Sequence, residues 1–165
     1  PAIFDRIQTS VELGYTEADM EFGIDLAFQQ LDLEKTLLDL QSCIDHANEK
    51  AKVGVVGYCF GGLLTWLSSC RLKNICAASA YYGGGIPDNA ALTPACPTIL
   101  HFGDQDAHIP MDSVQAFIAE QPGLPVYLYT ADHGFNCDQR ASCDVDAAKL
   151  ALERTLNLFN NNLVV

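Results

Sequence analysis

The stretch GYCFGG at residues 57–62 decides the fold of this 165-residue chain. An apolar run precedes it at residues 53–56, and a pattern of small and apolar residues typical of a helix follows it at 63–67. The order strand, sharp turn, helix puts Cys59 at the apex of a Gly-x-nucleophile-x-Gly pattern. Because glycines flank the apex, the backbone can turn tightly and leave the cysteine uncrowded. The pattern predicts a nucleophile above the end of a strand, with the N–H of Phe60 able to stabilise an oxyanion.

Acid and base candidates follow this turn along the chain. A second apolar strand, residues 97–103, runs into Asp104 and Asp106, and a third, residues 126–129, runs into His133. The carboxyl ends of parallel strands are where open sheets carry their functional loops. A nucleophile, an acid and a histidine therefore occur in the chain order that such a catalytic turn requires.

Each candidate also has a purely structural interpretation. Cys59 could be a small buried residue at an ordinary strand-to-helix turn, and the aspartates could be turn residues that bond their own backbone. His101 and His108 compete with His133 as the base. His101 falls inside a strand and is expected to be packed, and His108 follows Asp106 too closely to be the natural third member. The three motifs together are more specific than any one of them.

Several motifs carry a family resemblance: VGVVGYCFGG (53–62), YYG (81–83), HFG (101–103), the segment 106–110, HGF (133–135), RTLNLF (154–159) and PAIFDR (1–6). Taken in chain order, and with a cysteine at the apex, they resemble the dienelactone hydrolase family of α/β-hydrolases. The resemblance implies hydrolysis of a lactone or carboxylic ester, a small-molecule substrate, without cofactor or metal. It makes Cys59 the nucleophile, Asp106 the acid and His133 the base.

The resemblance also implies a fold. It predicts a parallel sheet with helices on both faces in one α/β domain, residues 1–165, with about four C-terminal strands. Family members carry further N-terminal strands, a glutamate that governs cysteine ionisation and a loop N–H that completes the oxyanion hole. No strand is expected here before 52–58, so that part of the fold is expected to be missing. The free edge of strand 52–58 should then be covered by the missing residues or by a second copy in a homodimer.

Hydrophobic periodicity gives the coarse layout. Helices are predicted at 16–30, 32–49, 61–70, 112–120 and 144–160, and strands at 52–58, 75–82, 97–103 and 126–130. Thr16 and Asp112 are the predicted N-caps of the first and fourth helices. The alternation of strands and helices favours a parallel sheet with right-handed crossovers.

Candidates for substrate binding come from the resemblance or lie near predicted strand ends; they are Arg6, Tyr81, Tyr82 and Phe135. Arg6 sits at the position of a family arginine, whereas the aromatic residues could equally be core. The family's other arginine lies four residues after the histidine, where this chain has Cys137. Arg140 either compensates for it or is a surface residue.

Composition narrows the function classes. Nine basic and 21 acidic residues give a net charge of −12, which argues against nucleic acid. No apolar stretch is long enough to span a bilayer, and no signal peptide is visible. Seven cysteines without a Cys-x-x-Cys pair favour reduced thiols in the cytoplasm. Most of them are expected to be small core residues.

Two rival functions remain open at this point. The first is a metal-dependent hydrolase that would use the histidines and aspartates of the strand-end loops: His101, Asp104, Asp106, His108 and His133. No His-x-x-x-His or glutamate pairing on a predicted helix arranges these residues as metal ligands. The second is a non-catalytic α/β module, a hydrolase fragment that has lost activity. The expected lack of N-terminal strands is its main support.

Overall fold

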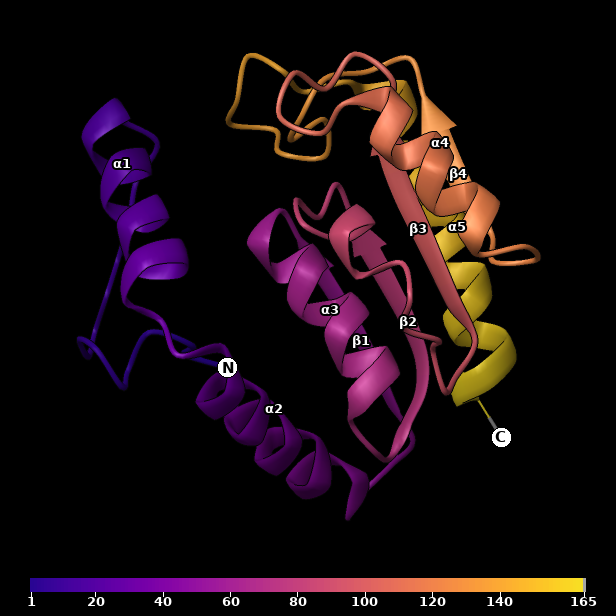
Figure 1. Ribbon diagram of the computed structural model, residues 1–165. Coiled ribbons are helices and arrows are strands. Elements are labelled where there is room, and N and C mark those ends of the chain that lie inside the picture. The colour runs from indigo at the N-terminus through magenta and orange to yellow at the C-terminus, as the bar shows by residue number, and fades with distance from the viewer. Residues whose placement is uncertain (165) are drawn as a thin grey trace.

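Four parallel strands form the centre of the molecule (Figure 1). They are β1 (Val53–Tyr58), β2 (Ile75–Tyr81), β3 (Thr98–Gly103) and β4 (Val126–Tyr129), and they lie side by side in chain order. This computed structural model describes residues 1–164. The parallel α/β sheet predicted from the sequence is therefore confirmed.

Helices cover both faces of the sheet and explain why its central strands, β2 and β3, are mostly apolar and largely buried. α3 (Phe60–Arg71) packs on β1 and β2, and α5 (Val145–Leu163) packs on the opposite face. A Cβ on Gly57 would meet α3, whereas one on Gly54 would meet Phe159 of α5. α4 (Met111–Glu120) is drawn near β3 and β4 in Figure 1, and its Phe117 reaches Trp66 of α3.

The core lies between the sheet and the α3–α4 layer. Trp66 of α3 is fully buried, and its ring lies edge-on to Phe117 of α4, with centroids 5.3 Å apart. The indole N–H donates to the carbonyl of Asn89, in the short turn η2 (Pro87–Asn89). Burial of such large aromatic side chains contributes most of the hydrophobic stabilisation of this layer.

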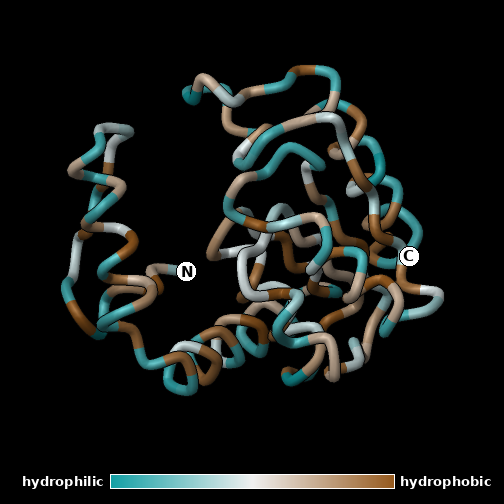
Figure 2. Tube along the Cα trace, turned by 45° about the horizontal axis from the view of Figure 1, so that its top comes forward, coloured by the Kyte–Doolittle hydropathy of each residue, from teal (hydrophilic) through white to brown (hydrophobic). Residues whose placement is uncertain are grey.

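The N-terminal region is built differently. α1 (Glu17–Asp25) contains no buried residue, and a single π-helical turn, η1 (Leu26–Gln30), continues it. α2 (Leu33–Asn48) then contacts α3 and β1. Both views show α1 standing apart from the sheet (Figures 1 and 2), and Figure 2 shows apolar stretches along it.

Thr16 caps α1 in a reciprocal bond with Asp19, as predicted. Three other details of the helices and cysteines differ from the sequence predictions. Asp112 does not cap α4, because that helix begins one residue earlier and Pro110 occupies the cap position; this prediction was wrong. α5 continues beyond the predicted end, to Leu163. None of the seven cysteines is fully buried, so their expected role as core residues was also wrong.

Candidate active site

The turn between β1 and α3 holds Cys59 in a strained conformation, with φ 54° and ψ −119°. A non-glycine residue with positive φ costs free energy and persists only where its surroundings enforce it. Two glycines allow this turn. A Cβ on Gly57 would collide with the carbonyl of Gly61, and a Cβ on Gly62 would collide with the carbonyl of Tyr81. The turn is therefore determined by close backbone packing.

The same turn fixes the backbone of Cys59 and places its thiol at the start of a helix. The amide of Cys59 donates to the carbonyl of Tyr81 at the end of β2 (3.1 Å), which fixes the apex against the sheet. α3 begins at Phe60, whose backbone N–H lowers the pKa of the Cys59 thiol and so favours the thiolate. A helix N-terminus adds a partial positive charge at this point. Negative charge at the apex is stabilised as a result.

Asp106 lies in the loop that follows β3, and its carboxylate is buried and fully engaged. One oxygen, Oδ1, accepts the backbone N–H groups of His108 (2.8 Å) and Ile109 (3.1 Å). The other, Oδ2, lies 2.7 Å from Nδ1 of His133. Two backbone donors thus fix the carboxylate orientation so that one oxygen is available to the imidazole.

His133 follows β4 and connects the other two side chains. Its Nδ1 faces Asp106, and its Nε2 lies 3.2 Å from Sγ of Cys59. In the sequence, His133 lies 27 positions after Asp106 and 74 positions after Cys59. Parallel pairing brings them together, because the ends of β1, β3 and β4 all open on the same edge of the sheet.

The pKa shifts in this group favour charge separation. Burial raises the pKa of the Cys59 thiol, but the hydrogen bond and charge of His133 outweigh it, so the pKa lies below its ordinary value. Burial lowers the pKa of His133, yet its bonds to Asp106 and Cys59 raise it to about 9. For Asp106, burial is likewise outweighed by His133, and the carboxyl pKa is lowered. A thiolate–imidazolium pair fits this arrangement.

The model of the dienelactone hydrolase family matches residues 11–163. The chain belongs to the dienelactone hydrolase family. A provisionally named carboxymethylenebutenolidase of Synechocystis is 35% identical over 99% of this chain and 74% of its own length. Carboxymethylenebutenolidase 1 of Cupriavidus pinatubonensis is 30% identical, over 96% of this chain and 71% of its own.

Solved structures agree with this family assignment. A provisionally named dienelactone hydrolase from Klebsiella pneumoniae superposes with a TM-score of 0.70 at 29% identity, over 79% of this chain. This chain spans 62% of that structure, somewhat less than two thirds. An esterase of Pyrococcus furiosus has a TM-score of 0.64 at 15% identity and supports the α/β-hydrolase fold alone.

The competing acid and base candidates of this dienelactone hydrolase family member lie elsewhere. Asp104 accepts a long bond from Thr130 (3.4 Å) and has no bond to His133. His101 is fully buried, with Nδ1 2.7 Å from the Tyr129 hydroxyl. Burial lowers the pKa of His101 to about 3, so it stays neutral. Within residues 1–164, no group of three or more histidine, cysteine or acidic side chains is arranged to hold a metal ion.

His108 is the exception among these candidates, because its side chain does reach the site. It is exposed, and its ring lies edge-to-face against that of His133, with centroids 5.2 Å apart. The geometry gives His108 no bond to Cys59 or Asp106 through its side chain. It can steady the imidazole of His133 by packing.

The candidate substrate-binding residues divide into two groups. Tyr81, Tyr82 and Phe135 are buried; the carbonyl of Tyr81 accepts the amide of Cys59, and the ring of Tyr82 lies 5.1 Å from that of His133. Arg6 forms two hydrogen bonds with Asp39 of α2. Its guanidinium is thus engaged by a carboxylate of the protein itself.

Arg140 lies near the site and bonds to no carboxylate among residues 1–164. Its guanidinium lies over the ring of Tyr15 (5.6 Å) and contacts the sulfur of Met20 (3.8 Å). It therefore connects the loop after His133 with the start of α1. Its charge also lowers the pKa of Cys59, after the larger influences of burial and His133.

One aromatic residue near the Cys59 turn could not be predicted from the sequence. Phe28, in η1, lies edge-to-face against Phe60, with ring centroids 5.2 Å apart and an interplanar angle of 70°. The two residues are separated by a helix and a strand, and no motif contains Phe28. The π-helical turn that presents it could not be read from periodicity, although such turns are frequent at functional sites.

Proposed function

We propose that this chain hydrolyses a lactone or carboxylic ester, with Cys59 as nucleophile, His133 as base and Asp106 as the orienting acid. One observation carries the proposal: the His133 imidazole lies 3.2 Å from the thiol and 2.7 Å from a buried carboxylate. The membership of a hydrolase family supports it. The comparisons favour this function over a non-catalytic module.

In the first step, the Cys59 thiolate attacks the substrate carbonyl carbon and a C–S bond forms. The carbonyl oxygen becomes an oxyanion, to which the N–H of Phe60 donates. As the tetrahedral adduct collapses, the C–O bond breaks and His133 gives its proton to the departing alkoxide. In a lactone that alkoxide stays attached to the acyl group through the opened ring. Asp106 keeps the proton-bearing Nδ1 of the imidazole in place throughout.

In the second step, water attacks the thioester carbonyl while the Nε2 of His133 takes one of its protons. The C–S bond breaks, the carboxylic acid leaves, and the thiolate–imidazolium pair is restored. Atoms balance as ester plus water giving acid plus alcohol, or lactone plus water giving a hydroxy acid. No redox partner or metal enters these steps.

Hydrolysis of p-nitrophenyl acetate tests this function. Cys59→Ala should abolish turnover, whereas Cys96→Ser, which changes a partly buried thiol in the loop before β3, should leave it unchanged. Limiting iodoacetamide should alkylate Cys59 before the other six thiols, because its pKa is lowered. First labelling of Cys43 or Cys96, or full activity of Cys59→Ala, would contradict the proposal.

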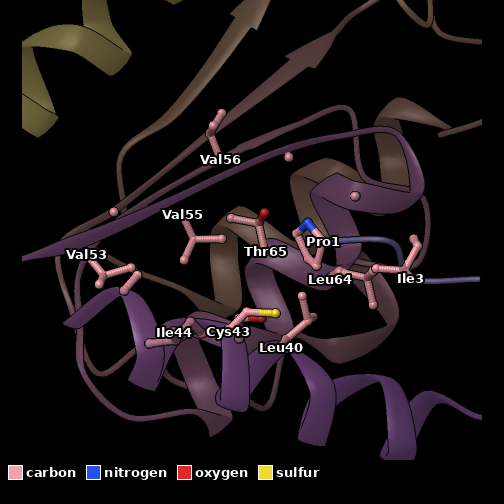
Figure 3. Close-up of a pocket in the computed structure, with 15 residues that line it drawn as sticks. Pro1, Ile3, Leu40, Cys43, Ile44, Val53, Val55, Val56, Leu64 and Thr65 are labelled. Carbon is pink, nitrogen blue, oxygen red and sulfur yellow. The ribbon is translucent and has the colours of Figure 1, made fainter. Parts of the chain in front are cut away.

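The outer edge of β1 has no partner strand within residues 1–164, where β1 pairs with β2 alone. An apolar groove of about 420 Å³ follows this edge between α2 and α3 (Figure 3). Val55 and Leu40 line it, and so does Ser68, whose buried hydroxyl has no hydrogen-bond partner among the described residues. Unpaired strand edges of this kind invite another strand.

We propose that a second copy covers this edge in a homodimer. Light scattering at micromolar concentrations should then give twice the chain mass. Val55→Lys, which puts a charge into the groove, should give monomers, whereas Leu128→Lys at the exposed far edge, on β4, should not. A monomeric wild-type chain would refute the homodimer.

The location proposed is the cytoplasm, since all seven cysteines are free thiols and a reducing compartment suits them. No helix within residues 1–164 combines the length and apolar character needed to cross a membrane.

A further inference from the structure

The side chain of Phe28 is unusual for its place in the fold. Its ring is 53% exposed, although its own helical turn is anchored by two buried neighbours, Leu26 and Ala27. An exposed aromatic ring on a fixed backbone presents apolar surface to whatever lies beside it. Here that surface adjoins the residue that follows the nucleophile.

The second ring belongs to Phe60, which is only partly buried. Phe60 is the first residue of α3 and directly follows Cys59, and its ring meets that of Phe28 at 5.2 Å. A substrate oxygen bound by the backbone N–H of Phe60 therefore lies close to the aromatic pair, because the Phe60 ring belongs to the same residue. The substituents of the reacting carbonyl must extend past these rings or away from them.

We propose that Phe28 and Phe60 form an aromatic wall of the substrate site that favours esters with an apolar ring beside the scissile carbonyl. This inference rests on the proposed function of Cys59. Phe28 is then a specificity-determining residue and takes no part in bond making. A substrate ring would stack on or meet the wall edge-on, as aromatic groups do at separations of about 5–7 Å.

Hydrolysis provides the first test. The ratio of kcat/KM for p-nitrophenyl phenylacetate to that for p-nitrophenyl acetate should fall about three- to tenfold in Phe28→Ala. Phe28→Leu should lie between the two, since it keeps apolar volume without the ring. Phe22→Ala is the matched control, because Phe22 is an exposed ring on α1 without a contact to Phe60. An unchanged ratio in Phe28→Ala would overturn the proposal.

Alkylation of Cys59 gives a readout that needs no turnover. The rate of N-benzyl-iodoacetamide relative to iodoacetamide should fall in Phe28→Ala by a similar factor and stay constant in Phe22→Ala. Circular dichroism checks that each variant is folded.

If no ester is hydrolysed but the alkylation ratio still falls in Phe28→Ala, the hydrolase function is refuted and the aromatic wall is supported. If esters are hydrolysed with Cys59 but neither the kcat/KM ratio nor the alkylation ratio changes in Phe28→Ala, only the aromatic wall is refuted. A preference for an anionic ester over the aromatic one would also contradict it.

Discussion

The sheet with its strand-end loops is tightly packed, whereas much of the N-terminal arm, residues 13–30, is exposed. In the sheet and the helix α3 packed on it, large side chains such as Phe102 and Trp66 are fully buried, and Asp106 is fixed by backbone bonds. In the arm, α1 has no buried residue, and Met20, Phe22 and Ile24 are all more than a third exposed. Stability therefore resides in the sheet.

The difference shows which part of the molecule holds its atoms in precise positions. Chemistry at Cys59 requires atoms held within a few tenths of an ångström, and a packed sheet supplies that. The arm reaches the region of the site through Tyr15 and Met20, which contact Arg140, and through Phe28, which contacts Phe60. α1, which has no buried residue, is loosely packed, and such segments open at low free-energy cost, whereas η1 is anchored by Leu26 and Ala27. We therefore expect α1 to open more readily than the sheet.

The largest effect is expected at the carboxylate of the packed region. Asp106→Asn should lower kcat by about 10³–10⁴, because an amide at this position favours the wrong imidazole tautomer. Asp104→Asn, two residues away, should change it less than about twofold, since Asp104 does not bond His133. Steady-state kinetics on p-nitrophenyl acetate measures both. A larger loss in Asp104→Asn would reverse the assignment of the acid.

The next effect concerns stability. Trp66→Ala should lower the free energy of unfolding by about 3–5 kcal/mol, because it leaves a large cavity between α3 and α4. Phe22→Ala on the arm should change it by less than about 0.5 kcal/mol. Urea titrations followed by circular dichroism give both values. Equal losses in the two variants would remove the distinction between the sheet and the arm.

The pH profile gives a smaller and more specific effect. Since the pKa of His133 is raised to about 9, its imidazolium is present below that pH and is lost as the pH rises through it. The rate should therefore fall on the alkaline side near pH 9. Loss of the Asp106 charge in Asp106→Asn should move this limb to lower pH. A limb that stays at the same pH in that variant would indicate another titrating group.

The smallest effect is local to the arm. Thr16→Ala removes the cap of α1 and should destabilise that helix by about 1 kcal/mol. Amide hydrogen exchange should accelerate along residues 17–25, while the unfolding midpoint of the whole chain stays the same. Thr16→Ser keeps the hydroxyl and serves as the control. A drop in the global midpoint would mean that the arm is coupled to the sheet.

Much of the sheet could be predicted because its signals are local. The apolar runs of β1 and β3 and the glycines around Cys59 each specify their own backbone. The contacts of Phe28 and His108 with the site could not be predicted, since they depend on how distant loops meet. The cap of α4 was misjudged because Asp112 resembles a cap in sequence, while Pro110 already ends the preceding extended stretch. The exposure of the cysteines depends on tertiary packing in the same way.

The positive φ of Cys59 has a consequence for evolution. Strain of this kind costs about 1–3 kcal/mol, which glycine at the same position would not incur. A lineage selected only for heat resistance would therefore tend to replace the apex residue, and one selected for catalysis must retain it. Persistence of cysteine at position 59 across descendants of this chain would record selection for activity, independently of any assay.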